Sequence, residues 1–353
     1  MSQPTPLPVL ILDGGLGTTL EDSPHDVRFT SHMPLWSSHL LISDPSTLCR
    51  VHREFIDAGA DIILTATYQT SIQGFEKTDP NLTSDDAAAY MRSAVQLAHN
   101  ACKQLTRRAP PRIALSLGPY GATVTPVSAE YSGVYPPEMD SEDSLCQWHS
   151  DRLRIFATDP PTWDGIHFVA FETIKRMDEV RAIRRAVGTV MRSSQPPSGK
   201  PWWITGVFPT EEVDEKAVRE WVRAALDSSS PGTVSLPRPW GVGVNCTTIG
   251  NIARIVGIME EEVVQLIDPA QHGVRPWLVL YPDGTRGERY DPVMKKWVEK
   301  ESTGLQRAWE DVFAEIVCQV DTRCWEGVIA GGCCRTGPRQ ICALANTLGH
   351  QSV

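Results

Sequence analysis

The sequence of 353 residues has no long apolar run, no basic start and no excess of positive charge. Its apolar stretches stay under ten residues, whereas a helix that spans a bilayer needs about 20. Residues 1–12 contain three prolines and lack the basic start of a secretory signal. We therefore expect no membrane partner and a cytoplasmic protein.

The charge balance is acidic, with a net charge of −10 at pH 7, and no basic patch interrupts it. Such a surface cannot neutralise the phosphates of a nucleic acid, so a nucleic-acid partner is not expected. No internal repeat or domain linker is visible. The sequence predicts one domain over residues 1–353, with 1–8 as a flexible N-terminus, and leaves a homo-oligomer open.

Cysteine is present nine times, an odd count. In a reducing compartment a disulfide framework is not expected, so clustered cysteines indicate metal binding or catalysis. Cys49, Cys102, Cys318 and Cys342 lie in helix-like stretches, where a free cysteine is expected to behave as a small buried apolar residue.

Short apolar runs rich in β-branched residues recur along the chain, and each precedes a stretch with helical periodicity. The runs predict strands over 9–15, 61–68, 112–120, 167–173, 202–209, 240–246, 277–282 and 327–334. The helical stretches cover 45–58, 84–106, 141–157, 177–191, 213–226, 249–259, 301–319 and 338–348. Apolar strands alternating with helices indicate a parallel sheet covered by helices. Eight such units favour the α/β class and a (β/α)8 TIM barrel, with an open doubly wound sheet as the alternative.

Chemically distinctive residues gather at the predicted strand ends, where such a barrel has its active site. Cys246 ends the sixth strand, and Cys333 and Cys334 end the eighth. Adjacent cysteines rarely bridge each other, but two thiolates can bind one soft metal where the backbone bends, as the pair Gly331-Gly332 permits. Three sulfur ligands would leave a fourth position open, as in catalytic zinc sites. The alternative is three buried cysteines with no shared role.

An open position on such a zinc ion suits a thiol substrate. A free thiol has a pKa near 8.5, and only its thiolate is a strong nucleophile. Coordination to a metal ion removes the thiol proton. The residues therefore predict activation of a substrate thiol for attack on an electrophile.

Eight short motifs then occur in a fixed order along the chain. They are Leu12–Thr18 (LDGGLGT), Pro34–Ser37 (PLWS), Thr65–Gln69 (TATYQ), Ser116–Ala122 (SLGPYGA), Glu130–Gly133 (EYSG), Phe171–Thr173 (FET), Gly243–Cys246 (GVNC) and Gly331–Arg335 (GGCCR). In this order they resemble the homocysteine S-methyltransferase family over residues 12–344. The resemblance implies that Cys246, Cys333 and Cys334 bind Zn²⁺ and that a homocysteine thiolate takes a methyl group from a sulfonium donor.

The resemblance also implies the substrate contacts. Asp13 and Glu172 would hold the α-ammonium group of homocysteine, which needs a carboxylate partner when buried. The loop after Asp13, with Gly14, would receive the substrate carboxylate. Tyr68, Gln69 and Tyr120 would shape the pocket, since an aromatic face attracts a cation.

The sequence leaves two interpretations open for Asn245 and two for Arg335. Asn245 would either orient the site through its amide or satisfy local backbone. Arg335 would either neutralise the zinc–thiolate cluster or pair with a surface acid.

Two segments depart from the family pattern. The loop 283–288 is about two residues longer and lacks the usual Asn-Ser pair before Tyr290-Asp291 and Trp297, and strand five also differs. Neither change touches a zinc ligand. The expected donor is S-methylmethionine or S-adenosylmethionine, with methionine as product, and no Gly-x-Gly-x-x-Gly indicates a nucleotide-binding fold. The alternatives are a methyltransferase for selenocysteine or another small thiol, and a non-catalytic zinc or redox protein built on Cys333-Cys334.

Overall fold

The computed structural model describes residues 7–30, 33–103, 110–125, 128–191, 199–227, 236–267, 274–285, 288–291, 296–299 and 307–349. Eight parallel strands follow one another in the order β1-β10-β7-β6-β5-β4-β3-β2. They are β1 Val9–Ile11, β2 Ile62–Leu64, β3 Arg112–Leu117, β4 Phe168–Ile174, β5 Trp202–Gly206, β6 Gly241–Thr248, β7 Trp277–Asp283 and β10 Val328–Ala330.

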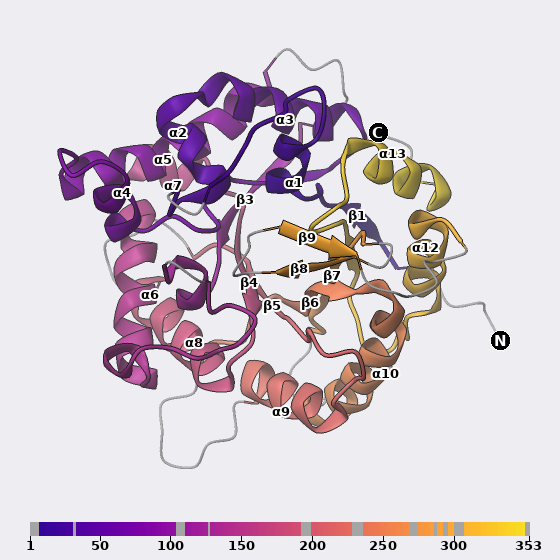
Figure 1. The fold of residues 1–353 in the computed structure, drawn as a ribbon. Coiled ribbons are helices and arrows are strands. Elements are labelled where there is room, and N and C mark those ends of the chain that lie inside the picture. Colours follow the sequence, from indigo (N-terminus) through magenta and orange to yellow (C-terminus); the bar gives the residue numbers. More distant parts are fainter. Residues whose placement is uncertain are drawn as a thin grey trace.

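The two edges of this sheet meet, because Leu12 pairs with Ile62 in a parallel bridge and the Asp13 N–H donates to Ile62 O at 3.1 Å. The sheet is therefore a barrel, and Figure 1 shows helices surrounding it. This confirms the predicted (β/α)8 fold and excludes the open doubly wound sheet.

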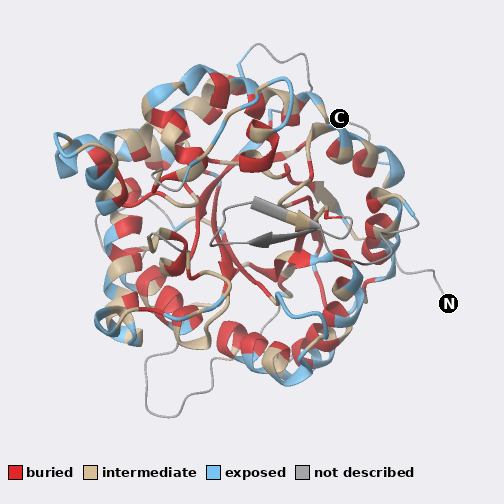
Figure 2. Cartoon of the chain, viewed as in Figure 1, coloured by how far each residue is buried: buried red, intermediate tan, exposed pale blue. Residues whose placement is uncertain are grey.

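The described α-helices are α1 Leu16–Glu21, α2 Leu40–Ser43, α3 Pro45–Asp57, α4 Ile72–Thr78, α5 Ser84–Ala101, α6 Glu142–Ala157, α7 Pro160–Asp164, α8 Met177–Met191, α9 Glu215–Leu226, α10 Ile249–Leu266, α12 Trp309–Gln319 and α13 Pro338–Thr347. Short 3-10 helices are η1 Trp36–His39, η2 Tyr120–Thr123 and η3 Pro137–Met139. Capping residues place several starts: Asp44 accepts the Thr47 N–H at 3.1 Å before α3, and Thr83 forms a capping box with Asp86 before α5. Figure 2 shows buried residues along the strands and helices of the ring.

Aromatic side chains fill the barrel at the amino ends of its strands. Trp240 and Trp277 stack with ring centroids 4.8 Å apart, and Phe168 packs against Trp203 at 5.6 Å. The Arg112 guanidinium lies over the Phe168 ring. This packing closes one end of the barrel and leaves the carboxyl ends of the strands to form a site.

Several predicted boundaries were wrong for identifiable reasons. Strands β1, β2 and β10 end earlier than predicted, because the chain beyond them turns into the loops that line the barrel mouth. Only single bonds continue between neighbouring strand ends, such as that from the Gly332 N–H to Asp13 O at 3.0 Å. Helix α10 continues past the predicted end at 259, since Glu262 is buried and bonded to Arg219 and Arg223.

An antiparallel hairpin of β8 Glu288–Asp291 and β9 Lys296–Glu299 was not predicted. In the view of Figure 1 it is drawn in front of the centre of the barrel. The predicted helical residues 104–106 and 301–306 lie outside the described residues.

Three other expectations concern membrane-spanning helices, the N-terminus and the burial of two cysteines. Within the described ranges no helix is long and apolar enough to cross a membrane. Residues 1–6 of the predicted flexible N-terminus lie outside the described part, and Pro8 O accepts the Val328 N–H at 2.9 Å. Cys318 and Cys342 are exposed, so the expectation of burial was wrong for both, because each lies on the outer face of its helix.

Candidate active site

One large cavity opens at the carboxyl ends of the barrel strands. Nine of the residues predicted from the sequence line it: Asp13, Gly14, Tyr68, Gln69, Glu172, Asn245, Cys246, Cys333 and Cys334. They come from the ends of β1, β2, β4, β6 and β10. The fold therefore brings together residues that are more than 300 positions apart in the sequence.

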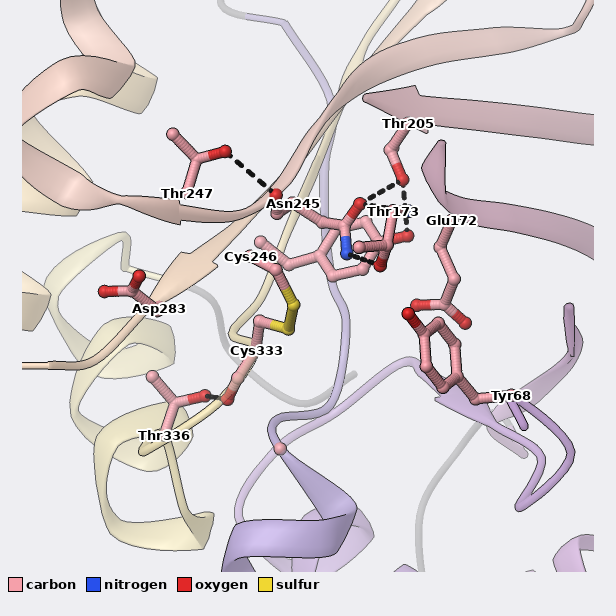
Figure 3. The surroundings of a disulfide bond; sticks show 12 residues. Tyr68, Glu172, Thr173, Thr205, Asn245, Cys246, Thr247, Asp283, Cys333 and Thr336 are labelled. Carbon is pink, nitrogen blue, oxygen red and sulfur yellow. Dashed lines mark hydrogen bonds between the residues drawn. A yellow bond between two sulfur atoms is a disulfide. The ribbon is translucent and has the colours of Figure 1, made fainter. Parts of the chain in front are cut away.

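The sulfur atoms of Cys246, Cys333 and Cys334 lie within 4.8 Å of one another. In this structure Cys246 and Cys333 are joined by a disulfide, and Cys334 is free (Figure 3). The sequence led us to expect no disulfide framework, and this single bond between two of the predicted ligands was not predicted. Thiols gathered closely enough to share one ion are also close enough to bond to each other. The bonded pair is not the vicinal pair Cys333-Cys334 on which the redox alternative rested.

Local backbone geometry produces this cluster. Cys246 lies within a register shift of β6, between Asn245 and Thr248, and has a φ of 45°, which turns its side chain out of the strand. Gly331 and Gly332 are needed because other parts of the chain approach their backbone closely, and not because the backbone bends there as predicted. A Cβ on Gly331 would lie 2.6 Å from Leu12, and one on Gly332 would lie 2.1 Å from Thr336. The left-handed residue after the cysteines is Arg335, with a φ of 62°.

The donor set fits a soft metal ion. The ends of β6 and β10, which lie on either side of β7, supply three sulfur atoms. Three is the number that a catalytic zinc ion takes from protein when one position stays open. Burial, together with the nearby carboxyl groups of Asp283 and Glu130, raises the pKa of the Cys334 thiol to about 12. A thiolate at this position therefore needs a cation beside it.

Asp13 presents one free carboxyl oxygen beside the cavity. Its Oδ2 accepts the Leu64 N–H at 2.8 Å, whereas Oδ1 is buried and accepts no hydrogen bond from the described residues. Burial, and to a lesser degree the Glu172 carboxyl, raise the pKa of Asp13 well above its ordinary value. Among the described residues that line the cavity there is no lysine, arginine or histidine with which this carboxylate could pair.

Glu172 faces the cavity from β4 and is 5% exposed. The Ser116 hydroxyl donates to its Oε1, and Tyr281 also forms a hydrogen bond with it. Burial raises the pKa of Glu172 to about 7, against the lowering effect of these bonds and of the Arg152 charge. Two buried carboxyl groups with raised pKa values form a suitable receptor for an ammonium group.

Asn245 uses its amide within the protein. Its Oδ1 accepts the Thr173 N–H and the Thr205 hydroxyl, each at 2.7 Å, and its Nδ2 donates to Thr173 Oγ1 at 2.7 Å (Figure 3). Both interpretations of Asn245 stay open, because its amide satisfies groups of the protein and thereby ties the end of β6 to β4 and β5. A contact between Asn245 and substrate stays a prediction.

The remaining predicted residues border the cavity in different ways. Tyr68 donates its hydroxyl to Glu130 Oε2 at 2.5 Å, and Gln69 donates its amide to Pro34 O at 3.0 Å. Gly14 allows close approach, because a Cβ there would lie 2.2 Å from Thr336 O. Its contact with a substrate carboxylate stays a prediction.

Two expected residues lie elsewhere. Tyr120 does not line the cavity: its N–H donates to buried Glu179 at 2.8 Å, and its ring packs on Tyr135, because η2 begins there. Arg335 forms an ion pair with Asp22 at 3.5 Å, which is the surface-acid alternative.

The sequence reasoning assigned no role to Arg152, which is fully enclosed and supports the site from behind. Its guanidinium donates to the carbonyl oxygens of Gly118, Thr67 and Tyr68, each at 2.8 Å. Arg152 continues the buried row of α6 that includes Leu145, His149 and Phe156, and this helical spacing was the available signal.

The fold and the site together define a (β/α)8-barrel enzyme with a three-cysteine centre. The model of the homocysteine S-methyltransferase family matches residues 10–348. The chain therefore belongs to the homocysteine S-methyltransferase family, as its motifs predict, and it is a methyltransferase that acts on homocysteine.

Known relatives match over nearly the whole chain. Homocysteine S-methyltransferase 2 of Zea mays is 31% identical, over 96% of this chain and 89% of its own length. Selenocysteine Se-methyltransferase of Brassica oleracea var. italica is 30% identical, over 96% of this chain and 88% of its own. The crystal structure of the homocysteine methyltransferase MmuM from Escherichia coli, metallated form, shares the fold with a TM-score of 0.67 and 22% identity, covering 96% of each chain.

Proposed function

We propose that this protein transfers a methyl group from a sulfonium donor to the thiolate of homocysteine, with Zn²⁺ held by Cys246, Cys333 and Cys334. The observation that carries this proposal is the cavity in which three sulfur atoms face two buried carboxyl groups. The sulfur cluster suits the thiol end of homocysteine, and Asp13 and Glu172 suit its ammonium end.

A zinc ion with three thiolate ligands would supply an open position and the charge that removes a substrate thiol's proton. The protein's own residues would do the rest. Asp13 Oδ1 and Glu172 would fix the ammonium group and so the direction of the side chain. Gly14 would border the substrate carboxylate, and Tyr68 and Gln69 would enclose the donor.

The methyl transfer needs no reactant other than the thiol and the sulfonium donor. The thiol proton leaves to solvent, and the thiolate sulfur forms a new bond to the donor's methyl carbon. The bond between that carbon and the sulfonium sulfur breaks, and its electron pair stays with the departing sulfur. Homocysteine becomes methionine, while the donor becomes a neutral thioether. S-methylmethionine and S-adenosylmethionine both meet this requirement.

Selenocysteine is the second candidate acceptor. It differs from homocysteine in the acceptor atom and in chain length, and a relative that is 30% identical is named selenocysteine Se-methyltransferase. Product analysis by mass spectrometry, with each acceptor and each donor supplied in turn, would distinguish these pairs. The non-catalytic zinc or redox alternative requires that no pair yields product.

Metal content tests the ligand set directly. The reduced protein should bind about one zinc per chain, and Cys246→Ser, Cys333→Ser and Cys334→Ser should each lose most of it with all activity. Oxidised protein should take up little zinc until a reductant opens the Cys246–Cys333 bond. Cys342→Ser, at an exposed cysteine, is the matched control and should keep both zinc and activity. Unchanged zinc in all three ligand variants would show that the ligand set is wrong.

A further inference from the structure

Four carboxyl groups line the cavity within the described residues: Asp13, Glu21, Glu130 and Glu172. The proposed function uses Asp13 and Glu172. Glu21 already lies in the field of two cations, since Arg335 and Arg28 both act to lower its pKa. Glu130 differs, because no described arginine, lysine or histidine forms an ion pair with it.

Hydroxyl groups are what hold the Glu130 carboxyl in place. Tyr68 donates to its Oε2 at 2.5 Å, and Ser128 forms a second hydrogen bond. The backbone beside it is also fixed: Ala129 N–H donates to Gly121 O at 2.9 Å, and a Cβ on Gly121 would lie 2.8 Å from Glu130 N. The carboxyl group is therefore held by two hydroxyl groups on a tightly packed turn.

This position faces both the aromatic wall and the sulfur cluster. Tyr68, Tyr131 and Trp36 line the same cavity, and the Trp36 ring packs directly on Gly17. Glu130 and the three cysteines line the same cavity, so the carboxyl group borders the space beside the sulfur atoms. A ligand between Tyr68 and the cysteines would lie against Glu130.

We propose that Glu130, supported by Tyr68, recognises the positive charge of the methyl donor. This inference rests on the proposed function. A carboxylate beside aromatic rings, with no cation of its own, is the arrangement that binds a sulfonium group. The same arrangement would bind the thioether product weakly, because the charge disappears when the methyl group leaves. Glu130 thus favours binding of the sulfonium donor over binding of the thioether that the donor becomes.

Steady-state kinetics with homocysteine tests this role. Glu130→Gln keeps an acceptor for the Tyr68 hydroxyl but removes the charge, and should raise the donor KM about ten- to hundredfold. The KM for homocysteine should change less than about threefold. Glu138→Gln, an exposed position on η3, makes the same change in net charge outside the cavity and should leave both constants unchanged.

A non-reacting cation separates charge recognition from positioning of Tyr68. Tetramethylammonium should compete with the donor, and not with homocysteine, in the wild type, and its inhibition constant should rise in Glu130→Gln. Tyr68→Phe removes the hydroxyl and keeps both the ring and the carboxylate, so its donor KM should rise less than that of Glu130→Gln. Equal effects in the two variants and in the double variant would mean that Glu130 only orients Tyr68.

The outcomes separate this inference from the function on which it rests. If the wild type transfers no methyl group from either sulfonium donor, both fail. If the wild type is active and Glu130→Gln keeps its donor KM, only the role of Glu130 fails. If Glu130→Gln does not fold, the wild type decides: tetramethylammonium that does not compete with the donor overturns the proposal.

Discussion

Asn245 and Thr173 bond to each other in both directions across the barrel. The Thr173 N–H donates to Asn245 Oδ1, and Asn245 Nδ2 donates to Thr173 Oγ1, each at 2.7 Å. Thr173 has a φ of 63°, a conformation that a threonine rarely adopts without such support. Because Thr173 follows Glu172 and Asn245 precedes Cys246, this pair fixes the ammonium side and the sulfur side of the site relative to each other.

Removal of the Asn245 amide should therefore damage both sides of the site at once. Asn245→Ala should lower the free energy of unfolding by on the order of 3 kcal/mol, because buried partners on Thr173 and Thr205 lose their hydrogen bonds. Zinc content and homocysteine affinity should fall together. Denaturant unfolding and metal analysis measure these effects. Asn251→Ala is the control, since that amide bonds to carbonyl oxygens at the surface and should change stability by under about 1 kcal/mol.

Glu172 should make stability depend on pH in the neutral range. Its folded pKa of about 7 lies above its ordinary value of 4.5, so the folded protein binds more protons than the unfolded chain between these values. The free energy of unfolding should therefore fall as pH rises from about 4.5 to about 7, by on the order of 3 kcal/mol. Denaturant unfolding at a series of pH values without ligand measures this slope.

The variant Glu172→Gln should flatten the slope, because glutamine does not titrate. Part of the slope should remain, since Asp13 also has a raised pKa and contributes in the same direction. A slope that is equally steep in Glu172→Gln would assign the effect to other groups. Homocysteine should flatten the slope in the wild type, because its ammonium group stabilises the ionised carboxylates.

The sequence was sufficient for the parts of this fold that repeat a simple pattern. Alternation of apolar runs and helical stretches predicts the barrel, and strand ends predict where Cys246 and Cys333 meet. Strand lengths were overestimated, because apolar residues beyond Ile11 and Ala330 line the mouth and look like strand residues. Pattern alone does not show where a chain stops pairing.

Contacts between segments that are distant in the sequence were the main features that the sequence did not predict. The short helical spacing that buries Arg152 is readable, but its three carbonyl partners lie on two other strand ends, and only the folded chain shows them. The bond between Glu130 and Tyr68 spans 62 positions and left no local signal. The disulfide was missed because the predicted proximity of the cysteines was taken to indicate a shared metal ion and not a bond between two of the sulfur atoms.

Arg152 should be among the residues whose loss costs the most stability. Burial lowers the pKa of Arg152 to about 9, so the guanidinium stays charged at neutral pH and bonds to three carbonyl groups. Arg152→Met should lower the free energy of unfolding by about 3 kcal/mol or more, since those carbonyls lose buried donors. Arg152→Lys should recover only part, because an ammonium group lacks the planar fork of donors.

The matched position is Arg154 on the same helix, where the side chain is partly exposed and pairs with Asp151. Arg154→Met should change stability by under about 0.5 kcal/mol. Thermal and denaturant unfolding of the three variants gives the comparison. Equal stability of Arg152→Met and Arg154→Met would contradict a supporting role for Arg152 behind Tyr68.

Homocysteine binding should release more than one proton near neutral pH. A thiol that binds to the metal as thiolate loses one proton. Glu172, with a pKa of about 7, is partly protonated in the free protein and should lose its proton when an ammonium group binds beside it. Asp13, whose pKa is also raised, adds to this second source. Calorimetry in buffers of different ionisation enthalpy measures the total.

Two variants separate these sources. When homocysteine binds, zinc-free Cys333→Ser should no longer release the proton of the substrate thiol but should still release protons from the carboxyl groups. Glu172→Gln should still release the thiol proton, and its total proton release should be smaller than that of the wild type. Raising the pH to 8 should reduce the carboxyl share in the wild type, because Glu172 is then already ionised. If the release is the same in Cys333→Ser as in the wild type, the thiol does not bind as a thiolate at the cysteine cluster. Methyl transfer would then require activation of homocysteine by another group in the cavity.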